Sequence, residues 1–334
     1  MFKKFNIQLF AWSEGQAGAP TVNPVNVTTQ SSMSPTMKPF IDTYLLENAR
    51  ENMVFNQFAH EEPMKGNKIE WRKFNTFAKA LTPLQEGVIP TGQTFGMTKI
   101  EAETTQHGDY VTISDRLSRE AFDNVIVGAT EEMGAAMGET YETLTRNIIV
   151  GGNSVMYCPN GDAEVTSRDA LTKDCILTPD VVNRAQTWLK KNKAPKINGS
   201  YVALIHPSVA YDLRNSAEWK EYHKYNDIAP IFKGEIGELH GVRFIETNNA
   251  KIWKEEGGTA KYATLFLGAK AFGVLKPDGE GTEMIVKTEG EIGGPINQFS
   301  TIGYKFRHGA KILYQERMLR VESGSYFGDF DEAN

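Results

Sequence analysis

Two stretches of alternating apolar and polar residues flank a segment that is dense in turn formers. In residues 68–80, Ile69 and Trp71 alternate with charged side chains, and Ile100 and Ala102 repeat the pattern in residues 95–114. This period of two is typical of β-strands with one polar face. The turn formers between the two stretches are Pro83, Gly87, Pro90, Gly92 and Gly96. The pattern therefore predicts a long two-stranded hairpin.

The expected length of this hairpin has a consequence for its stability. At about 3.3 Å per residue, each arm reaches roughly 40 Å, about twice the length of an ordinary strand. An isolated two-stranded ribbon is only marginally stable in water. We therefore expect a neighbouring molecule to cover it. The candidate contact residues are Trp71, Phe74, Phe77, Leu84, Glu86, Phe95 and Met97.

A long apolar stripe follows the hairpin. Ser114 or Asp115 is the expected N-cap of a helix that ends at Gly151 and Gly152. Apolar residues recur between these points at steps of three and four, which places them on one helix face. The helix would span roughly 50 Å at about 1.5 Å per residue. The stripe consists of Leu117, Ala121, Val125, Ala129, Met133, Met137, Tyr141, Leu144 and Ile148.

The segment before the hairpin has a different composition. Residues 14–39 are rich in Ser, Thr, Pro, Gly and Asn. Such a segment buries too little apolar surface to offset the entropy of ordering it, so we expect a flexible arm that becomes ordered only against another surface. Residues 40–50 then have the spacing of a short amphipathic helix.

The rest of the chain alternates between helix and strand patterns. Thr178-Pro179-Asp180 opens a helix towards Lys193, and Pro207 opens another towards Tyr222. Strands are expected at residues 201–205, 242–245 and 262–267. This alternation predicts a compact α+β module. Residues 300–321 are expected to form a pair of antiparallel strands that turn at His308 and Gly309.

Charge and cysteine usage exclude some classes of protein. The 334 residues include 36 basic and 42 acidic side chains, a net charge of −6. This balance argues against an enzyme with a broad basic face for nucleic acid, but not against a container for it. No run approaches the roughly 18 apolar residues of a membrane helix, so we expect no membrane partner. Cys158 and Cys175 are expected to be reduced thiols.

The sequence lacks the short motifs that carry common enzyme chemistry. It has neither a Gly-x-Ser-x-Gly elbow nor a phosphate loop that ends in Gly-Lys-Ser/Thr. His60-Glu61-Glu62 lacks the second histidine of a zinc helix, and Pro63 would break that helix. The six histidines fall in different expected elements. We therefore expect no catalytic, cofactor-binding or metal-binding residues, and not an enzyme.

Several short motifs, in this order along nearly the whole chain, resemble the N4-type family of tailed-phage major capsid proteins. The first is Asn6–Ala11, and the second, Leu84–Val88, lies at the expected hairpin tip. Each motif alone is weak, whereas the ordered set is specific. The remaining members are Gly108–Asp115, Leu144–Arg146, Ile205–Arg214, Gly234–Gly237 and Gly241–Thr247.

The resemblance implies the α+β shell fold named after phage Hong Kong 97. It implies an N-terminal arm, an extended loop that lies over an adjacent subunit, a peripheral domain with a long spine helix, and an axial domain. On this sequence the segments are 1–50 for the arm, 51–114 for the extended loop, 115–175 for the peripheral domain, 176–285 for the axial domain, and 286–334 for strands that return to the peripheral domain.

The implied function is that of a major capsid protein, made in the cytoplasm of a host bacterium and located in the virion. Copies would form hexamers and pentamers of an icosahedral head that encloses double-stranded DNA without reading its sequence. A portal and, in some heads, scaffolding or decoration proteins are the implied partners. Two alternatives remain: an encapsulin-like compartment, which shares the fold, and more distantly an α+β hydrolase.

Overall fold

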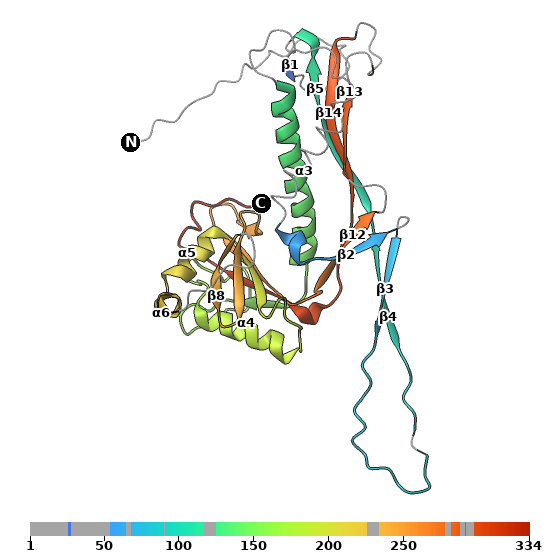
Figure 1. Cartoon of the computed structure of the whole chain (residues 1–334). Coiled ribbons are helices and arrows are strands. Elements are labelled where there is room, and N and C mark those ends of the chain that lie inside the picture. Colours follow the sequence, from blue (N-terminus) through green and yellow to red (C-terminus); the bar gives the residue numbers. More distant parts are fainter. Residues whose placement is uncertain are drawn as a thin grey trace.

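The computed structural model describes residues 26–27, 54–64, 68–89, 91–116, 125–225, 234–277, 282–287, 291 and 297–334. The expected arm (1–50) lies outside the described residues except for strand β1 (Asn26–Val27), and so does the helix expected at residues 40–50. The described chain has three parts: a spine built on helix α3, an α+β module beside its lower end, and a hairpin that projects away from both (Figure 1).

The spine is a long helix packed on a four-stranded sheet. Helix α3 (Val125–Val150) has 26 residues, which corresponds to about 39 Å. Its side chains Met133 and Met137 pack against Ile113, Ile302 and Phe306 of the sheet. The sheet order is β1-β5-β14-β13. Its other strands are β5 (Thr105–Ser114), β14 (Phe299–His308) and β13 (Glu283–Lys287).

The predicted apolar stripe is confirmed within α3, and the helix ends where the two glycines were expected to stop it. The amide of Gly151 donates to the carbonyl of Asn147, and that of Gly152 donates to the carbonyl of Ile149. At the other end, Ser114 is the last residue of β5, and Asp115 and Arg116 directly after it are helical. Residues 117–124, which separate this start from α3, lie outside the described residues, so the expected N-cap at Ser114 or Asp115 stays a prediction.

The α+β module is built on a seven-stranded mixed sheet with the order β6-β16-β11-β7-β9-β8, in which β10 also pairs with β11. The three predicted strands are confirmed almost to the residue as β7 (Tyr201–Ile205), β9 (Val242–Glu246) and β11 (Lys261–Leu267). The others are β6 (Val155–Tyr157), β8 (Glu235–Leu239), β10 (Ile252–Trp253) and β16 (Met318–Ser323).

Strand β7 shows why the sequences of the central strands in this sheet are continuous apolar runs. Every residue of β7 is buried. Tyr201, Ala203 and Ile205 face one core cluster, whereas Val202 and Leu204 face another. A strand that is covered on both faces has no polar face to show, so it lacks the alternation of a half-exposed strand.

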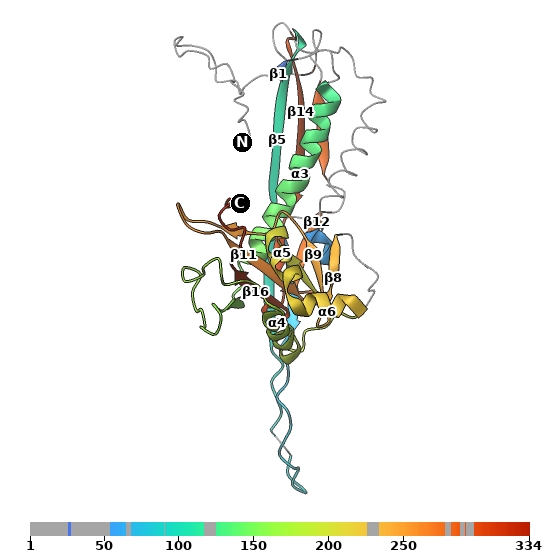
Figure 2. The same ribbon diagram turned by 90° about the vertical axis from the view of Figure 1, so that its left-hand side faces the viewer.

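Three helices accompany the module: α4 (Pro179–Lys191), α5 (Pro207–Asn215) and α6 (Ala217–Tyr225), seen from another side in Figure 2. Thr178 caps α4 as predicted. The single helix expected from Pro207 towards Tyr222 is instead two. Ser216 has extended backbone between them, and its hydroxyl bonds the Leu213 carbonyl at 2.7 Å, so a side chain competes with the helix.

A three-stranded sheet joins the spine, the module and the hairpin. Strand β12 (Phe272–Pro277) pairs in parallel with β2 (His60–Met64) and antiparallel with β15 (Ala310–Ile312). Two 3₁₀ turns flank it, η2 (Phe55–Phe58) and η3 (Gln315–Arg317). Figure 1 shows β2 and β12 between the foot of α3 and the hairpin.

The prediction of a strand pair in residues 300–321 that turns at His308 and Gly309 is wrong. Strand β14 pairs with β5 and β13, whereas β16 pairs with β11 and β6 in the module. The chain passes through Gly309 and continues into β15. A side chain on Gly309 would meet the carbonyl oxygen of Glu103 at 2.7 Å. The glycine therefore permits a close crossing and not a hairpin turn.

The predicted hairpin is shorter in its paired part than its pattern suggested. Only β3 (Lys68–Phe74) and β4 (Met97–Glu103) form the ladder. The second expected arm is divided after β4, and residues 105–114 form β5 of the spine. The alternating pattern continues across this division because both strands have one buried face, so the pattern does not reveal the change of partner.

Candidate assembly surface

The candidate surface is the projecting hairpin, which we define as residues 68–103. Strands β3 and β4 are antiparallel, with Trp71 opposite Ile100 and Phe74 opposite Met97. The pair begins beside the three-stranded sheet and then extends beyond the module into solvent in both views (Figures 1 and 2). The hairpin therefore has two parts: a root that contacts its own chain, formed by residues 68–74 and 97–103, and a free tip, residues 75–96.

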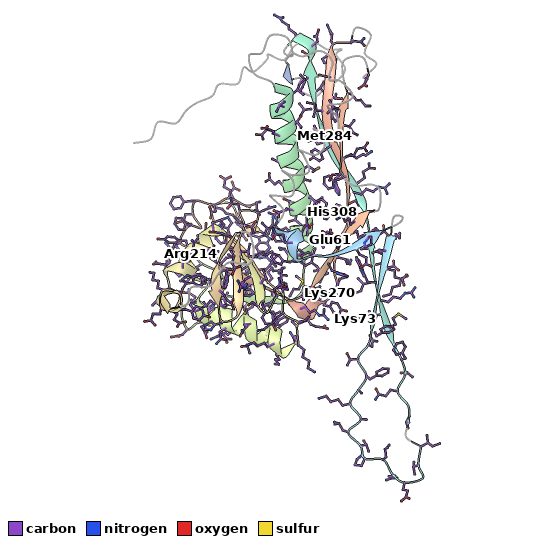
Figure 3. All side chains as sticks on the ribbon, in the orientation of Figure 1. Glu61, Lys73, Arg214, Lys270, Met284 and His308 are labelled. Carbon is purple, nitrogen blue, oxygen red and sulfur yellow. The ribbon has the colours of Figure 1, made fainter. Side chains whose placement is uncertain are left out.

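One face of the root packs against the body of its own chain. Ile69 and Trp71 lie against buried Ala102 and Leu275. The Lys73 ammonium lies 3.4 Å from a carboxylate oxygen of Glu316 and 4.6 Å from the centre of the Tyr314 ring. Figure 3 shows Lys73 at this junction. These contacts fix the direction in which the hairpin leaves the molecule.

The opposite face of the root is a ladder of charges. The Lys99 ammonium lies 2.8 Å from Glu70 and 2.5 Å from Glu101. Hydrogen bonds to Glu101 and Glu70 raise the pKa of Lys99, and the hydrogen bond from Lys99 lowers the pKa of Glu70. The pairs are exposed, so they contribute little to stability. Their charge keeps this part of the edge soluble.

Beyond Phe74 the two arms run on without a regular ladder. The Asn75 amide donates to the Gly96 carbonyl at 3.0 Å. Ala78 and the Gln93 side chain exchange two hydrogen bonds of 2.8 Å each. The turn at the tip includes Gly87, whose φ of +78° favours glycine. Few internal hydrogen bonds therefore hold the tip, residues 75–96.

Apolar side chains of the tip and the adjoining strand ends are exposed to solvent. Phe95 contacts Phe74 and Phe77, with ring centres 4.9 and 5.9 Å apart, yet all three rings are more than half exposed. Ile89 is 93% exposed and Leu81 is 83% exposed. Figure 3 shows side chains standing outward from the two thin arms of the hairpin. The contacts within the hairpin do not cover its apolar surface.

Six of the seven predicted contact residues lie exposed on this surface: Phe74, Phe77, Leu84, Glu86, Phe95 and Met97. Trp71 differs, because it is partly buried against its own chain. Its indole nitrogen is buried without a hydrogen-bond partner in the described part of the structure. Sequence reasoning missed Leu81, Val88 and Ile89, which are equally exposed. Apolar residues within a segment rich in Pro and Gly were the available signal.

Buried polar groups outside the hairpin form hydrogen bonds that connect α3 to neighbouring segments of the chain. Glu142 accepts hydrogen bonds from the amides of Val54 and Phe55. Burial raises its pKa, and these bonds oppose that shift. Arg146 donates to the Asn249 side chain at 2.6 Å. A cavity of about 710 Å³ beside these residues is lined in part by Glu142, Arg146 and Asn249, whose side chains already have partners within the chain.

The two described histidines with shifted pKa values, His308 and His206, are buried and make contacts that stabilise the fold. His308 bonds Thr145 at 2.8 Å, and burial lowers its pKa to about 4. His206 caps α5, and burial lowers its pKa. Within the described ranges, no group of three or more His, Cys, Asp or Glu side chains could hold a metal ion. None of the helices described is long and apolar enough to cross a membrane.

Comparison with known proteins places this architecture in a family. The family model described as phage capsid protein matches residues 96–287, more than half of the chain, from the returning arm of the hairpin to β13. None of the curated proteins matches the chain.

Solved structures share the fold at low sequence identity. The capsid of Ralstonia phage GP4 has a TM-score of 0.62 at 14% identity, covering 96% of this chain and 98% of that one. The capsid of cyanophage Pam1 has a TM-score of 0.63 at 10% identity, covering 93% and 99%. The SrpI encapsulin of Synechococcus elongatus scores 0.52 at 12% identity, covering 90% and 93%.

These neighbours have the Hong Kong 97-like fold that the sequence motifs implied, and the family model that matches more than half of the chain describes a phage capsid protein. The chain therefore belongs to the phage capsid protein family and is a major capsid protein, a subunit of the shell of a phage head.

Proposed function

We propose that the projecting hairpin lies over an adjacent copy of the chain and that this contact drives shell assembly. The exposed apolar tip is the observation that carries the proposal. Burying a side chain such as Leu, Ile or Phe contributes about 1.5–3 kcal/mol. Part of this gain offsets the entropy lost on association. Several such side chains on one hairpin are enough to favour binding to a neighbour.

Repetition of this contact would build the shell. A contact between two different surfaces of one chain is heterologous, and it closes into rings when its rotation allows. We propose hexamers and pentamers of an icosahedral head, made in the cytoplasm of the host bacterium. The finer assignment to the N4-type family rests on the ordered motifs from Asn6–Ala11 to Gly241–Thr247. A portal and scaffolding or decoration proteins complete the proposed partners.

The proposed content of the shell is double-stranded DNA, held without sequence recognition. The net charge of −6 is consistent with a shell that binds DNA only weakly, because tight binding to phosphates needs clustered positive charge. The chain would then act by self-association and not as an enzyme. The likeness to the SrpI encapsulin concerns the fold. Purified particles that contain an enzyme in place of DNA would favour the compartment.

The division into functional segments is also part of this proposal. The arm (1–50), extended loop (51–114), peripheral domain (115–175) and axial domain (176–285) keep their proposed roles. The last segment, 286–334, serves two parts, because β14 belongs to the spine sheet and β16 to the module sheet.

The test removes the tip alone. A short turn replaces residues 75–96 and joins Phe74 to Met97, which already face each other across the ladder. A wider deletion of residues 68–112 would also remove most of β5 and break the spine sheet. We expect a folded chain by circular dichroism and no shells by electron microscopy. Regular shells from the shortened chain would overturn the proposal.

Two variants of normal length complete the design. In the first, Leu84→Ser and Ile89→Ser remove apolar surface from the tip, and we expect a large loss of shells. In the second, Lys79→Gln changes an exposed polar residue of the same tip, and we expect normal shells. Because both variants keep the hairpin, a difference between them reports apolar contact and not chain length.

A further inference from the structure

The loop between Cys158 and Cys175 begins and ends on the same edge of one strand. The Cys158 amide donates to the Glu322 carbonyl of β16 at 2.9 Å. The Gly324 amide, directly after β16, donates to the Cys175 carbonyl, also at 2.9 Å. Residues two apart in an extended strand bond on the same side. The two cysteine backbones are therefore neighbours, although 17 positions separate them in the sequence.

Two further contacts fix this loop in place. The Arg168 guanidinium makes two hydrogen bonds of 2.7 Å to the buried carboxylate of Glu322. A side chain on Gly324 would collide with the carbonyl oxygen of Thr172, so the loop backbone packs directly on the glycine. The loop is held at its start, middle and end, and the separation of its two cysteines is fixed.

Both thiols are free, fully buried and members of the same hydrophobic core cluster. Burial raises the pKa of Cys158, and the nearby charge of Cys175 raises it further. The strand residues that the two cysteines bond to, Glu322 and Gly324, lie two positions apart in the chain, which corresponds to roughly 6.6 Å in an extended strand. Cysteines held at a similar spacing are near the Cα separation of about 4.4–6.8 Å that a disulfide spans.

We propose that Cys158 and Cys175 form an intrachain disulfide when the chain leaves a reducing compartment for an oxidising one. Each thiol loses one proton, and the pair loses two electrons to a small disulfide such as oxidised glutathione, which becomes two thiols. The disulfide joins the two ends of the loop beside β16. It reduces the entropy of the unfolded chain and so stabilises the module.

The surroundings of the two thiols determine when the disulfide forms. The thiolate is the attacking species, and a raised pKa in a buried site keeps it scarce. The reducing cytoplasm also keeps thiols reduced, whereas disulfides persist on particles outside the cell. The bond therefore forms slowly and after assembly. This timing rests on the proposed function, whereas the pairing of the two cysteines does not.

The test uses the full chain, both as shells and unassembled. Each sample is incubated with oxidised glutathione or with a reductant, then denatured and treated with a thiol-alkylating reagent. We expect two alkylated cysteines per reduced chain, matching the two in the sequence, and none after oxidation. Trypsin cleaves at Lys173, an exposed site between the cysteines. The oxidised fragments should stay joined until a reductant is added.

Single variants identify the partner of each thiol. Cys158→Ser and Cys175→Ser should show no joined fragments after oxidation. Two free thiols in the oxidised wild-type chain, glutathione adducts without a link, or links between chains would each overturn the proposal. Electron microscopy of the same samples reports shells independently. Shells without the bond contradict this inference alone, whereas the bond without shells contradicts the proposed function alone.

Discussion

The hairpin tip and the α+β module use the same kinds of apolar residue in opposite surroundings. In the module, Phe244 is fully buried, with ring centres 5.7 Å from Trp219 and 6.3 Å from Phe266. In the tip, Phe77 contacts Phe95 at 5.9 Å but is 54% exposed. The module obtains its neighbours from its own chain. The tip lacks them there, so its apolar surface is available for another copy.

The same deletion of a phenyl ring should therefore have opposite consequences in the two regions. Phe244→Ala removes a buried ring, and we expect a loss of about 3–5 kcal/mol from the free energy of unfolding. Phe77→Ala removes an exposed ring, and we expect a change within about 0.5 kcal/mol. Denaturant titration of the unassembled chain measures both.

The yield of shells per folded chain should rank the two variants in the opposite order, with the larger loss for Phe77→Ala. Phe77→Ala should lower the yield of shells from fully folded chain, measured by sedimentation. Phe244→Ala should lower the amount of folded chain, and the chain that does fold should assemble normally. Similar losses of stability in both variants would contradict the comparison, because they would mean that the tip already packs against its own body.

The foot of the spine, between the two regions, should depend on pH. His308, which is labelled in Figure 3, is buried beside the ring of Tyr141 and the hydroxyl of Thr145, with His107 near it. Burial and the charge of His107 lower its pKa to about 4, from about 6.5 in an unfolded chain. The unfolded chain then binds the proton first, so stability is full above pH 6.5 and falls as the pH drops towards 4.

Linkage sets the expected loss at up to about 3 kcal/mol. The variant His308→Gln keeps a partner for Thr145 but does not titrate in this range. Unfolding titrations at pH 7 and 4.5 should therefore show a smaller pH dependence in the variant than in the wild-type chain. The same pH dependence in both chains would mean that His308 is accessible to protons in the folded state.

The smallest expected difference concerns two threonine hydroxyls. Thr178 caps α4 in the module by accepting from the Val181 amide, and Thr178→Ala should cost about 1 kcal/mol. Thr98 of the hairpin donates to Asn75 at 2.9 Å in an exposed setting, and Thr98→Ala should change stability by less than about 0.5 kcal/mol. Melting curves of the two variants make the comparison. An equal shift would show that the hairpin is as cooperative as the module.

The sequence predicted where strands and helices lie better than it predicted which strands pair with each other. Strands β7, β9 and β11 and the cap at Thr178 follow from local signals, namely apolar runs between turn formers and a Thr-Pro-Asp start. The pairing of β5 with β14 joins residues almost 200 positions apart, and nothing local specifies it. The division of β4 from β5 was missed for the same reason.

The candidate surface shows the same limit at single residues. The apolar content of the tip was evident, and Phe74, Phe77 and Phe95 are exposed. Trp71 has the same residue character but lies on the other face of β3, towards Leu275. Alternation shows that a strand has two faces and not which of them meets the body. Leu81 and Ile89 were passed over because they interrupt a segment that otherwise reads as turns.

Amide hydrogen exchange of the tip, residues 75–96, in the unassembled chain and in shells tests the central claim most directly. Few internal hydrogen bonds hold the tip of the free chain, so its amides should exchange quickly, while those of β7 and β11 exchange slowly. In shells, tip amides should become strongly protected, with β7 and β11 unchanged. Equal exchange of the tip in both states would contradict the claim that a neighbouring copy covers it.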